Sequence, residues 1–288
     1  MGIYLNSKNP FGQFQDEATA TYFIDKSDML KELFYIGQEN SSLGKNNKYI
    51  CITRRPRRFG KTIMACMIAS FFGKGISNEA LFRKLKISTS EDFKCHINQH
   101  NVIYISFNEV PQNCADYLSY IERIHRKLKN DLKREFPSVE MNEDNAVWDI
   151  LIAIYEMEDA RFIFILDEWN YIFHRSFSTD HDKAAYVEFL SNLLKGKAYV
   201  ELAYMTGILP IAKYSSGSEL NMFFEYTTAT KKNTTGGIFM EVLYKRCCWI
   251  YIHKNMMVAC VFINVRKNDI CQLGRGCKNL VSMETRIS

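Results

Sequence analysis

Short apolar runs alternate with segments of helical periodicity over most of the chain. Four of these runs are almost continuously apolar and have the length of a strand. They cover residues 48–53, 101–110, 161–169 and 198–208. A sheet with one solvated face shows strict alternation of apolar and polar residues instead, so these runs indicate strands that are covered on both faces.

The segments between the runs predict helices. Residues 21–38 predict a short strand and then a helix, for which Ser27 or Asp28 is a candidate N-cap. The buried side of that helix is expected to consist of Met29, Leu30, Leu33 and Phe34. Further helices are expected over 61–75, ended by Gly73 and Gly75, over Asp116–Phe136, ended by Pro137, and over 182–196. Alternating strands and helices predict an α/β fold, a mostly parallel sheet flanked by helices.

The chain divides into three parts by its pattern. Residues 1–20 are expected to be a polar N-terminal arm, and residues 21–229 hold the alternating strands and helices. Residues 230–288 have a different character, with five of the nine cysteines and an apolar run at 256–265 that has neither helix caps nor a clear period. We expect this tail to be irregular.

The amino-acid composition and the sequence at the start of the chain favour an ordinary globular protein. With 47% hydrophobic residues, 24% charged residues and a formal net charge of +5, the chain has the balance of a soluble domain that needs no polyanionic partner. Its start lacks a basic-then-apolar leader and a myristoylation signal, and no apolar run reaches the ~18 residues of a spanning helix. Nine cysteines without a C-x-x-C pair favour reduced thiols. These features predict a cytoplasmic protein without a membrane segment.

Residues 54–62 read RRPRRFGKT and stand between a predicted strand and a predicted helix. A phosphate-binding loop needs backbone N–H groups at a helix N-terminus, a lysine for the phosphates and a hydroxyl for Mg²⁺. Gly60, Lys61 and Thr62 supply the end of such a loop. The usual first glycine would fall at residue 55, where the chain has Arg55. An arginine-rich patch that contacts nucleic acid is the alternative interpretation.

Acidic and hydroxyl side chains stand at the ends of two other predicted strands. Asp167 and Glu168 follow the apolar run FIFIL, and Thr206 lies near the end of the run 198–208. The C-terminal ends of parallel strands meet at the edge where a doubly wound sheet binds its ligand. We therefore expect Asp167 and Thr62 to hold Mg²⁺, Glu168 to polarise an attacking water, and Thr206 to contact the γ-phosphate or that water. Solvated carboxylates at a strand end are the simpler alternative for the acidic pair.

Two further groups of polar residues carry less information. The six histidines show no spacing typical of metal ligands, so we expect scattered surface histidines. The helical run 122–135, ERIHRKLKNDLKRE, is basic but interleaved with acids, which is typical of a solvated helix face.

The segment RPRRFGKT at 55–62 resembles the loop of the predicted AAA-ATPase-like family of bacterial proteins, which also has arginine at the first-glycine position. The resemblance extends to YFIDKSDMLKEL, VIYISFNEV, FILDEW and YMTGILPIAK, and so to residues 14–228. It implies a P-loop NTPase domain of the additional-strand type, with the Thr206 strand between the loop strand and the Asp167 strand. It also implies that ATP and Mg²⁺ are bound, with Asp167 as the metal residue and Glu168 as the water-activating residue. The nucleotide contacts would come from Arg55, Arg57, Arg58, Phe59, Gly60, Lys61 and Thr62.

Three features depart from the family pattern. The family commonly reads D-E-Y-D after the apolar strand, whereas this chain reads Asp167-Glu168-Trp169-Asn170 and lacks the second acid. Arg54 stands where threonine usually precedes the loop. The family often continues into a long helical region and a nuclease-like domain with a D…[DE]-x-K site, and neither is found after residue 230. The resemblance therefore suggests that the cysteine-rich tail at 230–288 comes from a truncated or frameshifted gene.

These observations lead to one main functional hypothesis and two alternatives. The main hypothesis is an ATP-binding domain that hydrolyses ATP with Mg²⁺ and acts as a nucleotide switch for a protein partner or a missing nuclease-like module. A nucleic-acid-binding protein that uses the arginine-rich loop is one alternative, and it predicts an affinity that falls steeply with salt. A truncated, inactive remnant is the other.

Overall fold

The computed structural model of the chain describes residues 2–21, 23–34, 48–53, 60–112, 114–142, 144–214 and 218–226, and two short strands at 250–253 and 256–259. The chain divides into two compact units, Met1–Tyr244 and Lys245–Ser288. Within its described residues, the second unit holds a hairpin of two antiparallel strands, β6 (Ile250–His253) and β7 (Met256–Ala259). The rest of the tail that we expect to be irregular lies outside the described residues.

Five parallel strands form the sheet of the first unit, in the order β2-β3-β4-β1-β5. The strands are β1 (Tyr49–Ile52), β2 (Asn101–Ser106), β3 (Phe162–Asp167), β4 (Val200–Thr206) and β5 (Phe224–Tyr226). The first four coincide with the apolar runs, so the predicted strands are confirmed. Strand β4, which ends in Thr206, lies between β1 and β3, and the strand order implied by the family resemblance is also confirmed.

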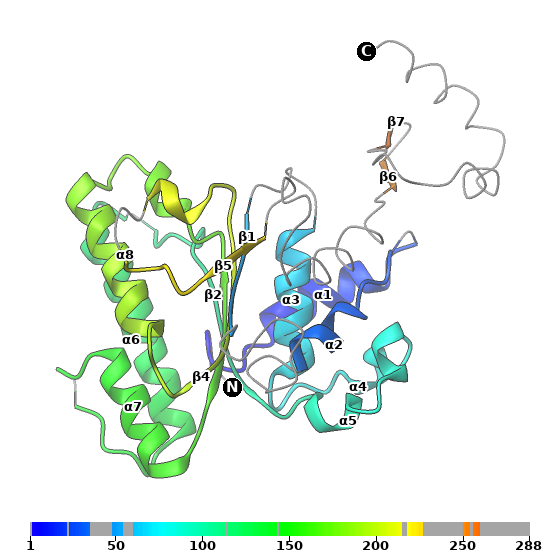
Figure 1. Ribbon diagram of the computed structural model, residues 1–288, viewed down its shortest axis with the longest axis horizontal. Coiled ribbons are helices and arrows are strands. Elements are labelled where there is room, and N and C mark those ends of the chain that lie inside the picture. The colour runs from blue at the N-terminus through cyan, green and yellow to red at the C-terminus, as the bar shows by residue number, and fades with distance from the viewer. Residues whose placement is uncertain are drawn as a thin grey trace. The chain divides into compact units, whose positions relative to one another are not determined.

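Helices cover both faces of this sheet (Figure 1). One face carries α6 (Tyr117–Glu135), α7 (Val147–Glu158) and α8 (Asp180–Leu194), and the other carries α3 (Lys61–Phe72) with α1 (Asn9–Ala18) and α2 (Met29–Phe34). Buried side chains form two hydrophobic clusters, and alternate residues of β2 contribute to them: Ile103 and Ile105 to one, Val102 and Tyr104 to the other. The predicted α/β fold, a parallel sheet flanked by helices, is therefore confirmed.

The helix boundaries follow the capping signals. The side chain of Asp116 accepts a hydrogen bond from the Ser119 N–H (2.7 Å) at the start of α6, and α3 ends just before Gly73. Helix α2 buries the four apolar side chains expected of it. The strand expected before α2 is not found: residues 23–26 have no regular secondary structure. Two apolar residues there, Phe23 and Ile24, are too short a run to specify a strand without a partner strand.

The sequence analysis missed several short helices. Each has only three or four residues, which is too few to show helical periodicity. They are α4 (Glu79–Phe82), η1 (Lys86–Thr89), α5 (Phe93–His96), η2 (Tyr171–His174) and η3 (Ile211–Lys213). Among the described residues, no helix combines the length and the apolar character that crossing a bilayer requires.

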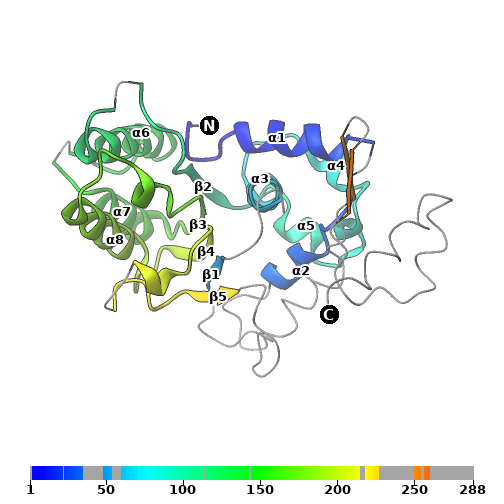
Figure 2. The same cartoon turned by 90° about the horizontal axis from the view of Figure 1, so that it is seen from above.

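The residues expected to form an N-terminal arm pack onto the first unit. Leu5 pairs with Ile103 in an antiparallel bridge, and the Tyr104 N–H donates to the Tyr4 carbonyl (2.9 Å). Strand β2 is an edge of the sheet, so this segment covers backbone groups that would otherwise be unpaired. Helix α1 then runs beside α3, with Phe14 fully buried (Figure 2).

Candidate functional site

The N-terminus of α3 forms one side of the candidate site. Gly60 has a left-handed backbone (φ 72°, ψ 26°), which glycine adopts without strain, and α3 begins at Lys61. Lys61 is only 8% exposed. The first N–H groups of a helix have no partner within it and attract anions, so this end of α3 suits a phosphate. The other predicted loop contacts, Arg55, Arg57, Arg58 and Phe59, lie outside the described residues.

Asp167, the last residue of β3, is at the centre of the site, and its side chain is fully buried. The hydroxyl of Thr206, at the end of the neighbouring β4, donates a hydrogen bond to Asp167 Oδ1. The other oxygen, Oδ2, is buried and has no hydrogen-bond partner of normal geometry. A buried charged oxygen without a partner is costly, which makes Oδ2 a ready ligand for a cation.

Four groups around Asp167 act on its ionisation. Burial raises the pKa of Asp167, and these four groups oppose the rise. In decreasing order of effect they are the Thr206 hydroxyl, the Thr62 hydroxyl, the Glu168 backbone N–H and the Lys61 ammonium. All four belong to residues that the sequence analysis singled out. The structure thus brings the start of α3 and the ends of β3 and β4 together around one carboxylate.

Glu168 follows Asp167 in a conformation that is rare for a residue other than glycine. Its φ is 54°, in the left-handed region, which costs about 1 kcal/mol or more. The Glu168 N–H donates to Thr206 Oγ1 (3.3 Å), and the Trp169 N–H donates to the Thr206 carbonyl (2.9 Å). These bonds hold the turn after β3 against the end of β4. The Glu168 side chain is partly exposed, so water can reach it.

The oxygen atoms of this site fit Mg²⁺. Magnesium prefers hard oxygen ligands and is usually held by one or two carboxylates together with phosphate oxygens and waters. The Asp167 carboxylate and the Thr62 hydroxyl are ligands of this kind, and Asp167 Oδ2 is unpaired. Within the described ranges, no three His, Cys, Asp or Glu side chains gather as a metal site. A metal at Asp167 would therefore depend on the oxygens of a bound phosphate.

The sequence analysis missed the residues that join the loops after β3 and β4. Asn170 is buried, and its Oδ1 accepts a hydrogen bond from the Ile208 N–H (2.9 Å). A Cβ at Gly207 would overlap the Trp169 indole nitrogen and Asn170 Oδ1, so only glycine fits there. Asn170, which departs from the family pattern, thus holds the loop after β4. The only sign of this role in the sequence was the unusual D-E-W-N pattern. The hydrogen bond itself could not be predicted, because Asn170 and Ile208 are 38 positions apart in the chain.

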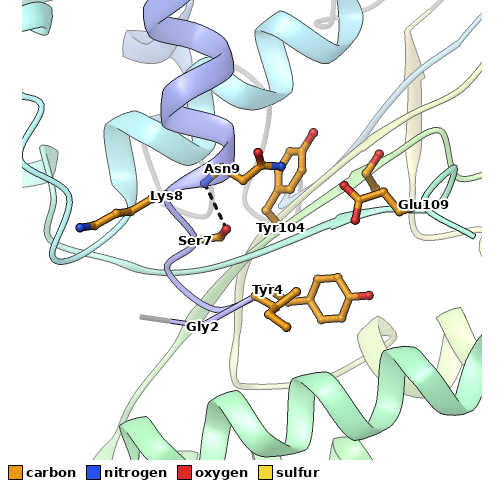
Figure 3. A pocket seen from close by; sticks show the side chains of 9 residues that line it. Gly2, Tyr4, Ser7, Lys8, Asn9, Tyr104 and Glu109 are labelled. Carbon is orange, nitrogen blue, oxygen red and sulfur yellow. Dashed lines mark hydrogen bonds between the residues drawn. The ribbon is translucent and has the colours of Figure 1, made fainter. Parts of the chain in front are cut away.

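A pocket of about 530 Å³ opens at the end of β2 (Figure 3). Tyr4, Tyr104 and Glu109 lie around it, and Ser106, which also lines it, pairs with Asp167 in the register of β2 and β3.

The Tyr104 hydroxyl lies 3.6 Å from Cys66 Sγ on α3. Burial raises the pKa of the Cys66 thiol to about 12, so Cys66 is protonated and unreactive at neutral pH.

Two histidines form a pair, so the expectation of scattered surface histidines is wrong for them. His96 Nδ1 lies 3.1 Å from His100 Nε2, and His100 Nδ1 lies 2.8 Å from Glu201 Oε1. Burial and then the neighbouring His100 lower the pKa of His96. Both rings contact Phe72 at the C-terminal end of α3. They therefore pack at the opposite end of α3 from Lys61.

Comparisons with known proteins give one family match. The model of a protein family described as "Predicted AAA-ATPase" matches residues 10–216. No curated protein has detectable sequence similarity to this chain. Among solved structures, the crystal structure of Cdc6p from Pyrobaculum aerophilum is similar at 12% identity and a TM-score of 0.35. The similarity covers 73% of this chain and 48% of that chain, so the chain spans about half the length of that protein. It is too weak to carry an argument.

Proposed function

Since this chain belongs to the predicted AAA-ATPase family, whose model matches residues 10–216, we propose that it binds Mg-ATP at the C-terminal edge of its sheet and hydrolyses it. The observation that supports this most directly is the convergence of Lys61, Thr62 and Thr206 on the buried Asp167. A lysine, a hydroxyl and a carboxylate at a helix N-terminus are the groups that a metal-bound triphosphate requires.

In this proposal each side chain has one role in binding. The Lys61 ammonium pairs with the β- and γ-phosphates, and the N–H groups at the start of α3 donate to phosphate oxygens. Thr62 and Asp167 Oδ2 hold the metal ion, which when bound neutralises charge on the phosphates. The loop residues Arg55, Arg57, Arg58 and Phe59 complete the nucleotide contacts.

Hydrolysis requires a group that orients water at the γ-phosphate. We assign this role to Glu168, whose side chain is partly exposed at the same edge of the sheet. Thr206 holds Asp167 in place through its hydroxyl, and it would contact the γ-phosphate or the attacking water. The Thr206 hydroxyl also accepts a hydrogen bond from the Glu168 N–H. A change at the phosphate would therefore move the loop after β3 and the loop after β4 together. This coupling would let a cytoplasmic protein of this kind act as a nucleotide switch for a protein partner or a nuclease-like module.

Calorimetry of Mg-ATP binding tests the proposal. Lys61→Ala is expected to weaken Mg-ATP binding at least about tenfold, because a charge-assisted contact to phosphate is lost. Lys74→Ala removes an exposed lysine beyond the other end of α3 and is the matched control, with no expected change. Glu168→Gln is expected to keep binding and to lose phosphate release. Equal affinity of the wild type and Lys61→Ala would contradict the proposed site.

A further inference from the structure

One acidic side chain of the basic run on α6, Asp131, is withdrawn from the helix surface in the fold. Asp131 is 3% exposed and faces the N-terminal segment, where its Oδ2 accepts from the Tyr4 N–H (2.7 Å) and the Leu5 N–H (3.3 Å). Its Oδ1 pairs with Arg134 at 2.8 Å. The carboxylate in the middle of the basic run is therefore buried and does not neutralise the exposed surface. The expected solvated face is confirmed for the exposed Arg126, Lys133 and Arg134, and Asp131 departs from it.

Cationic side chains of α6 gather instead around a hollow of about 480 Å³. Arg126, Lys129 and Lys133 line it, and their spacing of three and four residues puts them on one side of the helix. Asn130, Asn142 and Ile150 also line the hollow, so it lies between α6 and the chain that leads into α7. No ion pair found among the described residues involves Arg126 or Lys133.

The lining carries an excess of positive charge. Among the described residues that line the hollow, three carry a cationic side chain and one, Glu122, carries a carboxylate. His125 adds no charge at neutral pH, because burial and then the nearby Lys129 ammonium lower its pKa. The described side chains therefore present a net positive charge of two and many N–H donors to one hollow. Its size is within the range of about 300–1,000 Å³ that is typical of small-ligand sites.

These properties favour one class of anion. A phosphate monoester carries a charge of about −1.5 to −2 at pH 7 and has three strong acceptor oxygens. A single carboxylate carries only one negative charge and has two oxygens, and a phosphodiester also carries one charge. Arginine and lysine together suit a phosphate, since the guanidinium binds two oxygens and the ammonium groups add charge. We propose that the hollow between α6 and α7 binds a small ligand through a phosphate monoester group.

Inorganic phosphate is the probe that tests this proposal, with binding followed through the NMR signal of the His125 ring. The measurement is made in the Lys61→Ala background, so that the proposed nucleotide site does not contribute. The double variant Arg126→Gln with Lys133→Gln is expected to weaken phosphate binding by at least about tenfold through the loss of two charge-assisted contacts. The control is Lys84→Gln with Lys94→Gln, which removes the same charge from exposed residues outside the hollow. It is expected to bind phosphate like its parent.

Two comparison ligands decide the class of anion. Acetate and an oligonucleotide without terminal phosphates are expected to bind more weakly than inorganic phosphate. The proposal is overturned if phosphate does not shift the His125 signal, or if both double variants bind it equally. It is also overturned if the oligonucleotide binds more tightly and loses affinity in the Arg126 and Lys133 variant, since the surface would then be a nucleic-acid site. Mg-ATP binding by the protein with intact Lys61 is measured separately, so failure here leaves the nucleotide site untouched.

Discussion

The hydroxyl of Thr206 donates a hydrogen bond to Asp167 across two neighbouring parallel strands. The bond uses Asp167 Oδ1 and leaves Oδ2 buried without a hydrogen-bond partner of normal geometry. The fold therefore holds a carboxylate in place while leaving half of it unsatisfied. The unsatisfied oxygen lowers the stability of the free protein. This stability is recovered only when a cation or a hydrogen-bond donor binds.

Replacing Asp167 with asparagine is expected to stabilise the ligand-free protein at neutral pH by about 1 kcal/mol and to abolish metal-dependent nucleotide binding. Burial raises the pKa of Asp167 above the ordinary aspartate value of 3.8, so the folded state holds the proton more tightly than the unfolded chain. The free energy of unfolding of the wild type therefore falls as pH rises from 3.8 to the folded-state pKa. The advantage of the asparagine variant is largest above this interval and shrinks below it.

Urea unfolding at a series of pH values measures this difference. Asp144→Asn, at an exposed aspartate, is the control and should show no such dependence. An advantage of Asp167→Asn that stays constant from acidic to neutral pH would show that the charge on Asp167 is not its source.

Gly207→Ala is expected to destabilise the protein by about 1–3 kcal/mol, because the added Cβ overlaps the Trp169 indole and Asn170 Oδ1. Gly12→Ala makes the same chemical change inside α1, where nothing lies within 4 Å of the new Cβ. It should stabilise by up to about 1 kcal/mol, since alanine is the better helix former. Thermal unfolding of the two variants gives both values. Similar melting temperatures for the two would disprove the close packing described for Gly207.

Asn170→Leu is expected to cost about 1–3 kcal/mol, because it leaves the partly buried Ile208 N–H without its acceptor. Asn170→Asp keeps an oxygen at the same place and is expected to retain this hydrogen bond. Hydrogen exchange at the Ile208 amide reports the bond directly, with fast exchange expected only in the leucine variant. If exchange is equally slow in both variants, another group protects the amide and Asn170 does not hold this loop.

The order of strands and helices was predictable because it depends on properties of short segments. Buried strands are apolar throughout, and the N-cap of α6 at Asp116 and the Gly73 stop of α3 are local signals. The short strand β5 and the short helices between residues 76 and 100 were missed, since a few residues carry no period. Helices α1 and α7, of 10 and 12 residues, were also not predicted. The position of β4 between β1 and β3 came from the family resemblance, not from the apolar pattern.

By itself, the amino-acid sequence determined the α/β alternation and the residues that stand at the ends of β1, β3 and β4. Only the tertiary structure decided which of those groups meet. Asp167 is held by Thr206 and Asn170 binds the Ile208 N–H, while Asp131 is withdrawn from the surface of α6 to bind the backbone of Tyr4. Each of these pairs joins residues far apart in the chain. Burial and hydrogen bonding between such residues depend on how the helices and strands pack, which no short stretch of sequence contains.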